Sequence, residues 1–180
     1  MPLFYTGKGD KGSSVVGKKK VPKDSPVIIA LGDLDELNSF IGFARALVKE
    51  KILAQKLERV QQDLFIIQAQ IAWFLYPKFK APKLREERIR SIEREIDRLE
   101  RVIQPERSFI LPGSNTSSAL LHVLRSVARR AERNMFVVSR KRKVPNEVLT
   151  YLNRLSSYFY ALARREAHRK KIKETKPTYT

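Results

Sequence analysis

The sequence predicts an all-α protein, a five-helix bundle preceded by an irregular, glycine-rich arm. Apolar residues recur every three or four positions in five successive segments, which is the spacing of one face of a helix. Short connectors separate these segments, as in helical bundles. Four of the seven glycines, by contrast, lie in the first seventeen of the 180 residues. We therefore expect one domain with an arm over 1–31, a bundle over 32–173 and a frayed tail over 174–180.

The arm has the composition of a phosphate-binding loop. Its glycines leave backbone amides open to an anion, and lysines and hydroxyls flank them. The segment from Gly7 to Gly12 matches G-x-G-x-x-G, but no strand precedes it, and Ser13 stands where a P-loop has its lysine. The residues alone therefore support a phosphate-binding arm and a loose terminus about equally. The side chains that favour phosphate are Thr6, Lys8, Lys11, Ser13 and Ser14.

Two β-like stretches, 14–16 and 27–31, lie in the arm, and the first helix is expected to follow them. Asp33 and Glu36 have the spacing of a capping box, which predicts a helix start near Asp33. The apolar face then continues from Leu34 to Leu47.

The next two helices are expected over about 52–75 and 83–103. Pro77 stops the first of them, and Pro82 and Pro105 bracket the second. The second also has Glu–Arg and Asp–Arg pairs four residues apart on its wet face, which support a solvent-exposed helix.

The last two helices, over about 116–140 and 145–173, each carry a polar row beside an apolar stripe. Arg125, Arg129 and Glu132 share one helical face, and arginine suits multi-donor phosphate recognition. A surface ladder of ion pairs is the commoner role of such a row and is favoured on the residues alone. Asn153 and Tyr160 in the last helix suit a nucleoside or a flat macrocycle, or form an ordinary boundary row.

Composition narrows the function classes. The net charge of +18 fits a nucleic-acid partner or a small polyanionic ligand on a generally basic surface, and the basic clusters taken alone are typical of solvated faces or tails. The absence of cysteine excludes disulfides, thiol catalysis and thiolate metal sites. No apolar run approaches the ~20 residues of a membrane helix, and no signal peptide is evident, so we expect a cytoplasmic protein. His122 and His168 lack metal-ligand spacing.

A series of short motifs, in order over residues 5–164, resembles the PduO-type ATP:cob(I)alamin adenosyltransferases. Each motif is modest alone, but the ordered set is specific. The motifs are Tyr5-Thr6, Gly9-Asp10-Lys11-Gly12, Lys23-Asp24, Gly32 to Gly42, Phe109-Ile110-Leu111-Pro112-Gly113, Leu121-His122 with Arg125, Arg129-Arg130-Ala131-Glu132-Arg133, and Tyr151-Leu152-Asn153-Arg154-Leu155-Ser156.

The resemblance implies a homotrimer that binds ATP between subunits, with Mg²⁺ on the triphosphate and cobalamin as the second substrate. Asp35 and Arg125 match an inter-subunit salt-bridge pair, and Arg129 serves the leaving triphosphate. Phe109 and Tyr160 are expected at the cobalamin. Gly7, Lys8, Ser114, Ser157 and Tyr160 depart from the family pattern. ATP contacts are expected from Thr6, Gly7, Lys8, Gly9, Ser13, Ser14, Lys23, Arg129, Arg130, Glu132, Arg133 and Asn153.

The resemblance thus predicts an enzyme that transfers the 5′-deoxyadenosyl group of ATP to the cobalt of cob(I)alamin. Two alternatives stay open at this point. The first is a basic helical nucleic-acid-binding protein, which the net charge favours. The second is a relative that binds ATP or cobalamin without turnover.

Overall fold

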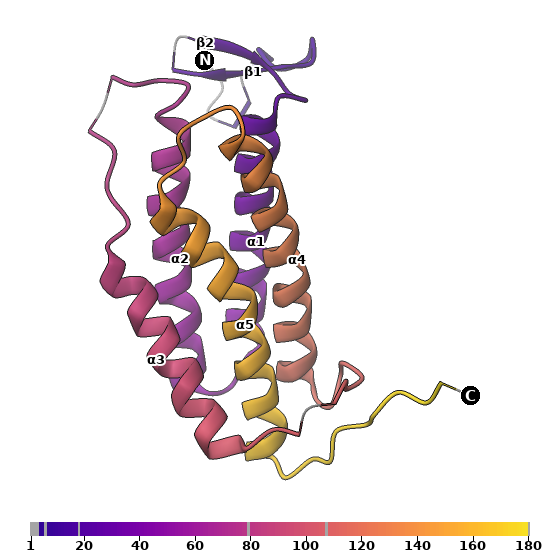
Figure 1. Cartoon of the computed structure of the whole chain (residues 1–180). Helices are drawn as coiled ribbons and strands as arrows, with labels where there is room; N and C mark the ends of the chain where they lie inside the picture. The colour runs from indigo at the N-terminus through magenta and orange to yellow at the C-terminus, as the bar shows by residue number, and fades with distance from the viewer. Residues whose placement is uncertain (1–3, 6, 18, 79, 107, 180) are drawn as a thin grey trace.

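The computed structural model describes residues 4–5, 7–17, 19–78, 80–106 and 108–179. Its bulk is a bundle of five long helices, and a small antiparallel sheet lies across one end of it (Figure 1). This confirms the predicted all-α architecture. The elements are β1 Ser13–Val16, β2 Lys19–Pro22, α1 Pro26–Leu47, α2 Lys51–Ala72, α3 Glu86–Ile103, α4 Thr116–Ser139 and α5 Asn146–Arg169.

The helices pack in a simple neighbour order. α4 lies between α1 and α5, α2 packs on the other side of α1, and α3 packs on α5. The core between them is made of large aliphatic and aromatic side chains with no solvent exposure, such as Leu34, Leu64, Leu121 and Phe159. Burying each such side chain contributes about 1.5–3 kcal/mol to stability.

The first helix begins at Pro26, seven residues before the expected start at Asp33, so the β-like reading of 27–31 was wrong. Proline suits the first position of a helix, and Ser25 before it is extended. Val27 and Ala30 are buried and extend the apolar face that continues at Leu34. Packing of this face in the bundle outweighs the β-preference of the branched residues.

The other helix ends lie within four residues of the prediction, and local caps explain where two of them fall. α3 ends at Ile103, and the backbone of Gln104 after it is left-handed with φ 46°. α4 begins after Asn115, whose side-chain oxygen accepts a hydrogen bond from the Ser118 amide at 3.1 Å.

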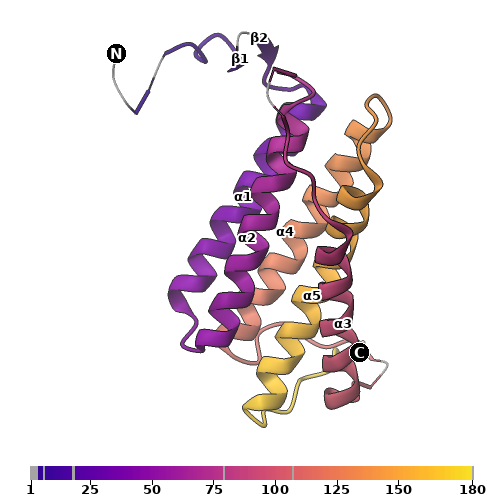
Figure 2. The same cartoon turned by 90° about the vertical axis from the view of Figure 1, so that its left-hand side faces the viewer.

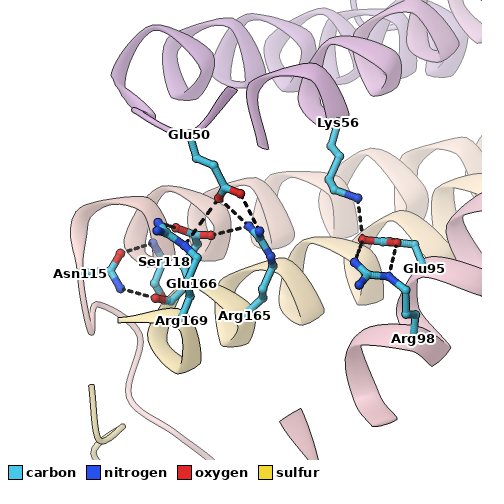
Figure 3. Close-up of polar contacts among 9 residues, drawn as sticks. All are labelled: Glu50, Lys56, Glu95, Arg98, Asn115, Ser118, Arg165, Glu166 and Arg169. Atoms are coloured by element: carbon cyan, nitrogen blue, oxygen red, sulfur yellow. Dashed lines mark hydrogen bonds and ion pairs between the residues drawn. The ribbon is translucent and has the colours of Figure 1, made fainter. Parts of the chain in front are cut away.

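Two networks of ion pairs fasten the bundle at points distant in sequence (Figure 3). Glu50, between α1 and α2, accepts two hydrogen bonds at 2.6 Å from Arg165 of α5. The Arg165 guanidinium holds the pKa of Glu50 below its ordinary value. Lys56 of α2 reaches Glu95 of α3 at 2.5 Å.

The tail, expected to be frayed, is held to the bundle over residues 174–176. Arg164 of α5 donates to Glu174 at 2.5 Å, and the Leu111 amide donates to the Thr175 carbonyl at 2.8 Å. In the described ranges, no helix has the length and apolarity needed to cross a membrane.

Candidate functional site

A cavity of about 540 Å³ opens between α4, α5 and the connection from α3 to α4. Its position between helices and its mixed lining are typical of a small-molecule site. One wall is apolar and comes from the connection, and the other walls come from the polar rows of α4 and α5. The lining residues are Ser108, Phe109, Ile110, Pro112, His122, Arg125, Arg129, Ser156, Ser157 and Tyr160.

The aromatic wall of the cavity combines an exposed ring with two packed ones. Phe109 is 80% exposed, so its ring is available to a ligand. The rings of Tyr160 and His122 form a T-shaped pair with centroids 5.9 Å apart. Burial and the nearby Arg125 guanidinium lower the pKa of His122, which keeps its imidazole neutral at pH 7. A neutral aromatic surface of this kind suits a large flat ligand.

The cationic wall is formed by Arg125 and Arg129 of α4. Neither guanidinium pairs with a carboxylate among the residues that the structure describes, and Arg125 Nε is buried without a partner. An unpaired buried donor is costly, so the arrangement favours an incoming acceptor such as a phosphate or a carboxylate. The sequence prediction that these arginines share one face is confirmed.

The expected pair of Asp35 and Arg125 does not form within one chain. Asp35 is exposed on α1 and has no ion pair in the described part of the protein. Large apolar side chains are exposed on the same helix at Phe40 and Phe43, and on its neighbour α4 at Phe136. Exposed apolar side chains on neighbouring helices are compatible with a surface that meets another protein.

Arg130, an expected ATP contact, pairs with carboxylates of α1. Its guanidinium donates to Asp33 Oδ1 at 3.2 Å and to Glu36, and Asn134 donates to Asp33 Oδ2 at 2.5 Å. The sequence motif gave Asp33 and Glu36 a capping role. Since α1 begins at Pro26, these carboxylates lie beyond its first turn and instead bind α4.

Glu132 and Asn153, two expected ATP contacts, lie next to each other, and Arg133 is exposed on the neighbouring surface. Asn153 donates to Glu132 at 2.6 Å. Sequence reasoning missed Arg154, which donates to Asn153 at 2.6 Å and pairs with Glu93 of α3 at 2.8 Å. This chain of contacts fixes the orientation of the Asn153 amide.

The arm folds into a compact turn followed by the β1–β2 hairpin, which includes Ser13 and Ser14. The Gly12 amide donates to the Gly9 carbonyl at 3.2 Å, and the Lys23 amide donates to the Gly12 carbonyl at 3.0 Å. Lys23 therefore lies beside the glycine loop, as a phosphate-binding role requires. Gly7 and Gly12 have φ of +65° and +72°, which favours glycine. Thr6 lies outside the described residues, and Lys8 follows Gly7 in the same turn.

The arm and the cavity's aromatic wall lie at different ends of the molecule. Figures 1 and 2 show the hairpin at one end of the bundle and the α3–α4 connection, residues 104–115, near the other. One chain therefore does not bring its own arm to its Phe109 loop.

Comparison with known proteins identifies the family to which this architecture belongs. Residues 4–166 match the family profile of cobalamin adenosyltransferase. The chain belongs to this family.

Relatives of the cobalamin adenosyltransferase family resemble the chain over most of its length. A corrinoid adenosyltransferase of Bacillus subtilis is 37% identical, over 89% of this chain and 84% of the relative. The human corrinoid adenosyltransferase MMAB is also 37% identical, over 96% of this chain and 73% of the relative.

A solved structure shares the fold. It is a variant PduO-type ATP:corrinoid adenosyltransferase from Lactobacillus reuteri, complexed with cobalamin and ATP. It superposes with a TM-score of 0.90 at 32% identity, over 98% of this chain and 97% of that one.

Proposed function

We propose that this chain transfers the 5′-deoxyadenosyl group of ATP to the cobalt of cob(I)alamin, forming adenosylcobalamin and releasing triphosphate. The observation that carries the proposal is the cavity lined by exposed Phe109 and half-buried Tyr160 together with Arg125 and Arg129, which have no carboxylate partner among the described residues. A flat macrocycle suits the aromatic wall, and a polyphosphate suits the cationic wall. Membership of the cobalamin adenosyltransferase family supports both ligands.

The reaction needs positioning more than side-chain chemistry. Cob(I)alamin is a strong nucleophile, and its cobalt supplies both electrons of the new Co–C bond as the C5′–O bond to triphosphate breaks. The protein holds the two reactants in line and stabilises the charge that grows on the leaving triphosphate. Arg129 is suited to this stabilisation, and the lysines of the arm add to it. The neutral His122 is not required as a base.

Mg²⁺ would accompany the triphosphate. Within the described ranges, no group of three or more His, Cys, Asp or Glu side chains is arranged to hold a metal ion. The phosphate oxygens would therefore supply most of the ligands, as is usual for Mg²⁺ bound with a nucleotide. The ion would neutralise charge on the leaving group.

The complete site would form between subunits of a homotrimer. Three observations support this: the separation of the arm from the Phe109 loop, the lack of an ion-pair partner for Asp35 and Arg125 in the described part of the chain, and the exposed apolar residues on α1 and α4. In this arrangement Asp35 of one subunit pairs with Arg125 of the next. The nucleotide would lie between the arm of one subunit and Arg129, Arg133 and Asn153 of its neighbour. We expect the enzyme to act in the cytoplasm.

In this proposal Glu132 and Arg130 act through neighbouring residues. Glu132 orients Asn153, to which it is hydrogen bonded at 2.6 Å. Arg130 acts through Asp33 and Glu36, which hold it at the junction of α1 and α4. Gly7, Lys8, Gly9, Ser13, Ser14 and Lys23 form the arm's share of the ATP site, together with Thr6.

The test is an anaerobic assay of the purified protein with reduced cobalamin, ATP and Mg²⁺. The reaction is monitored by corrin absorbance and by the release of triphosphate. We expect adenosylcobalamin from the wild type, and a loss of ATP affinity of about tenfold or more in Arg129→Ala. Asp97→Asn, an exposed change on α3, is the control. A wild type that makes no adenosylcobalamin, with an Arg129→Ala variant that binds ATP normally, would refute the proposal.

The nucleic-acid-binding protein and the non-catalytic relative predict different results. A nucleic-acid-binding protein with this charge would lose affinity steeply as salt rises, and Asn153 and Glu132 would be dispensable. A non-catalytic relative would bind ATP or cobalamin without releasing triphosphate.

A further inference from the structure

The end of the chain returns to the cavity and contacts the loop that carries Phe109. The Leu111 amide donates to the Thr175 carbonyl at 2.8 Å, and Lys176 pairs with Glu106. Within the described part of 105–114, the bond from Leu111 is the backbone hydrogen bond that reaches another segment of the chain. The position of this loop therefore depends on residues 174–176.

Arg164 joins the same tail segment to the wall of the cavity. It donates to Glu174 Oε2 at 2.5 Å and to the Tyr160 hydroxyl at 2.9 Å. The two charged side chains are only 10% and 13% exposed. A pair withdrawn from water to this extent is costly to break from one side, since the remaining charge is left without a partner. The pair therefore holds Tyr160 and the tail in a fixed relation.

The neighbouring arginine shows that this contact is specific to one face of α5. Arg165 turns to the other side and binds Glu50 between α1 and α2 (Figure 3). Its pair is buried to a similar degree, with exposures of 19% and 20%. Arg164 and Arg165, adjacent on α5, thus form two arginine–carboxylate pairs. The Arg164 pair also contacts Tyr160 in the wall of the cavity.

We propose that residues 174–176 are a latch that positions the Phe109 loop over the cavity, and that Arg164 and Glu174 are its positioning pair. The proposal rests on the proposed function, because it treats the cavity as the cobalamin side of the site. Arg164 and Glu174 act through Tyr160 and the loop and take no part in the reaction itself.

The first test needs no substrate. Amide hydrogen exchange is measured at Leu111 in the wild type, in a chain ending at Lys173 and in a chain ending at Pro177. Loss of residues 174–180 removes the Thr175 acceptor, and we expect exchange at Leu111 to accelerate about tenfold or more. The chain ending at Pro177 keeps residues 174–176 and should exchange as the wild type does. Unchanged exchange in the shorter chain would overturn the latch.

The second test separates positioning from stability. In Glu174→Gln we expect the KM for cobalamin to rise about fivefold while the KM for ATP stays within about twofold, as the charged pair is weakened. Glu50→Gln is the matched control, because it weakens the Arg165 pair and should leave both KM values unchanged. Equal rises of both KM values in Glu174→Gln, or the same change in Glu50→Gln, would overturn the proposal.

The two tests distinguish failure of the latch from failure of the proposed function. A wild type without transferase activity would refute the proposed function, and the exchange rate of Leu111 would still decide whether residues 174–176 order the loop.

Discussion

Tyr151 donates a hydrogen bond from its hydroxyl to Asp63 Oδ2 at 2.9 Å, in the buried space between α2 and α5. Arg88 of α3 reaches the other carboxylate oxygen at 3.2 Å, so the three side chains join three helices. Burial raises the pKa of Asp63, against the effects of Tyr151 and Arg88. Tyr151 therefore contributes both to packing and to keeping a buried carboxylate satisfied.

Replacing Tyr151 with phenylalanine should destabilise the bundle. The ring stays, but Asp63 loses its hydrogen-bond donor, which costs about 1–3 kcal/mol of unfolding free energy. Urea denaturation at pH 7 measures this loss. Tyr158→Phe on the same helix is the control, because its hydroxyl makes no hydrogen bond to a carboxylate among the residues that the structure describes. A variant as stable as the wild type would show that the bond is not needed.

Replacing Glu95 with glutamine should destabilise the protein at neutral pH and matter less in acid. Arg98, with help from Lys56, lowers the pKa of Glu95 to about 2 from an ordinary 4.5. A carboxyl with a lowered folded pKa stabilises the protein above the unfolded pKa, and this contribution is lost as pH falls through the folded pKa. We expect Glu95→Gln to lower the unfolding free energy by about 1–3 kcal/mol at pH 7.

Denaturation of the two proteins across the acid range checks the sign. The difference between them should shrink as pH falls from about 4.5 toward about 2. A difference that grows in acid would contradict the assignment. Glu87→Gln, which removes an exposed pair with Arg94, serves as the control and should change stability little.

Replacing Gly17 with alanine should disturb the arm and leave the bundle intact. Gly17 has φ of +62°, and a Cβ there would overlap the ring of Tyr76, which follows α2. Strain from both sources should displace the β1–β2 hairpin and lower ATP affinity about tenfold, while the melting midpoint stays near that of the wild type. The double variant Gly17→Ala, Tyr76→Ala removes the overlap and should recover part of the affinity. An unchanged ATP affinity in the single variant would separate the hairpin from the nucleotide site.

Asp35→Asn and Arg125→Ala should weaken turnover more than folding, because their partners are expected on different subunits. We expect each change to lower kcat/KM at least tenfold, with a double variant little worse than either single one. Thermal melts run beside the kinetics check that the fold is kept. A collapsed fold in either variant, or fully additive losses in the double variant, would contradict the pairing.

The apolar spacing was sufficient to predict the helices, but contacts between distant residues were not predictable from it. The spacing located all five helices because each buries one face in the bundle. It missed the first turns of α1, where β-branched residues hid a buried helical face, and it missed the hold on the tail at Glu174. The Asp63–Tyr151 and Asp33–Arg130 contacts join residues 88 and 97 positions apart, so no local pattern contains them.

The candidate site was predicted in part for the same reason. Arg125 and Arg129 share a helical face, so their convergence on one cavity followed from spacing. Phe109 and Tyr160 line the same cavity, and their contact with cobalamin stays a prediction. Arg164 lies in the predicted last helix, but its bond to Glu174 depends on how the chain turns after α5.

The hold on residues 174–176 has a practical consequence for anyone who labels the protein. A fluorophore or affinity tag added after residue 180 could displace residues 174–176, which contact Leu111. One added before residue 1 could disturb the glycine-rich turn of the arm. The turn at 140–143 between α4 and α5 is exposed and lies away from the Phe109 loop, at the hairpin end of the bundle. Since Lys141 and Arg142 of this turn line a cavity together with residues of β2, a probe attached there would report on the arm and leave the Phe109 loop free.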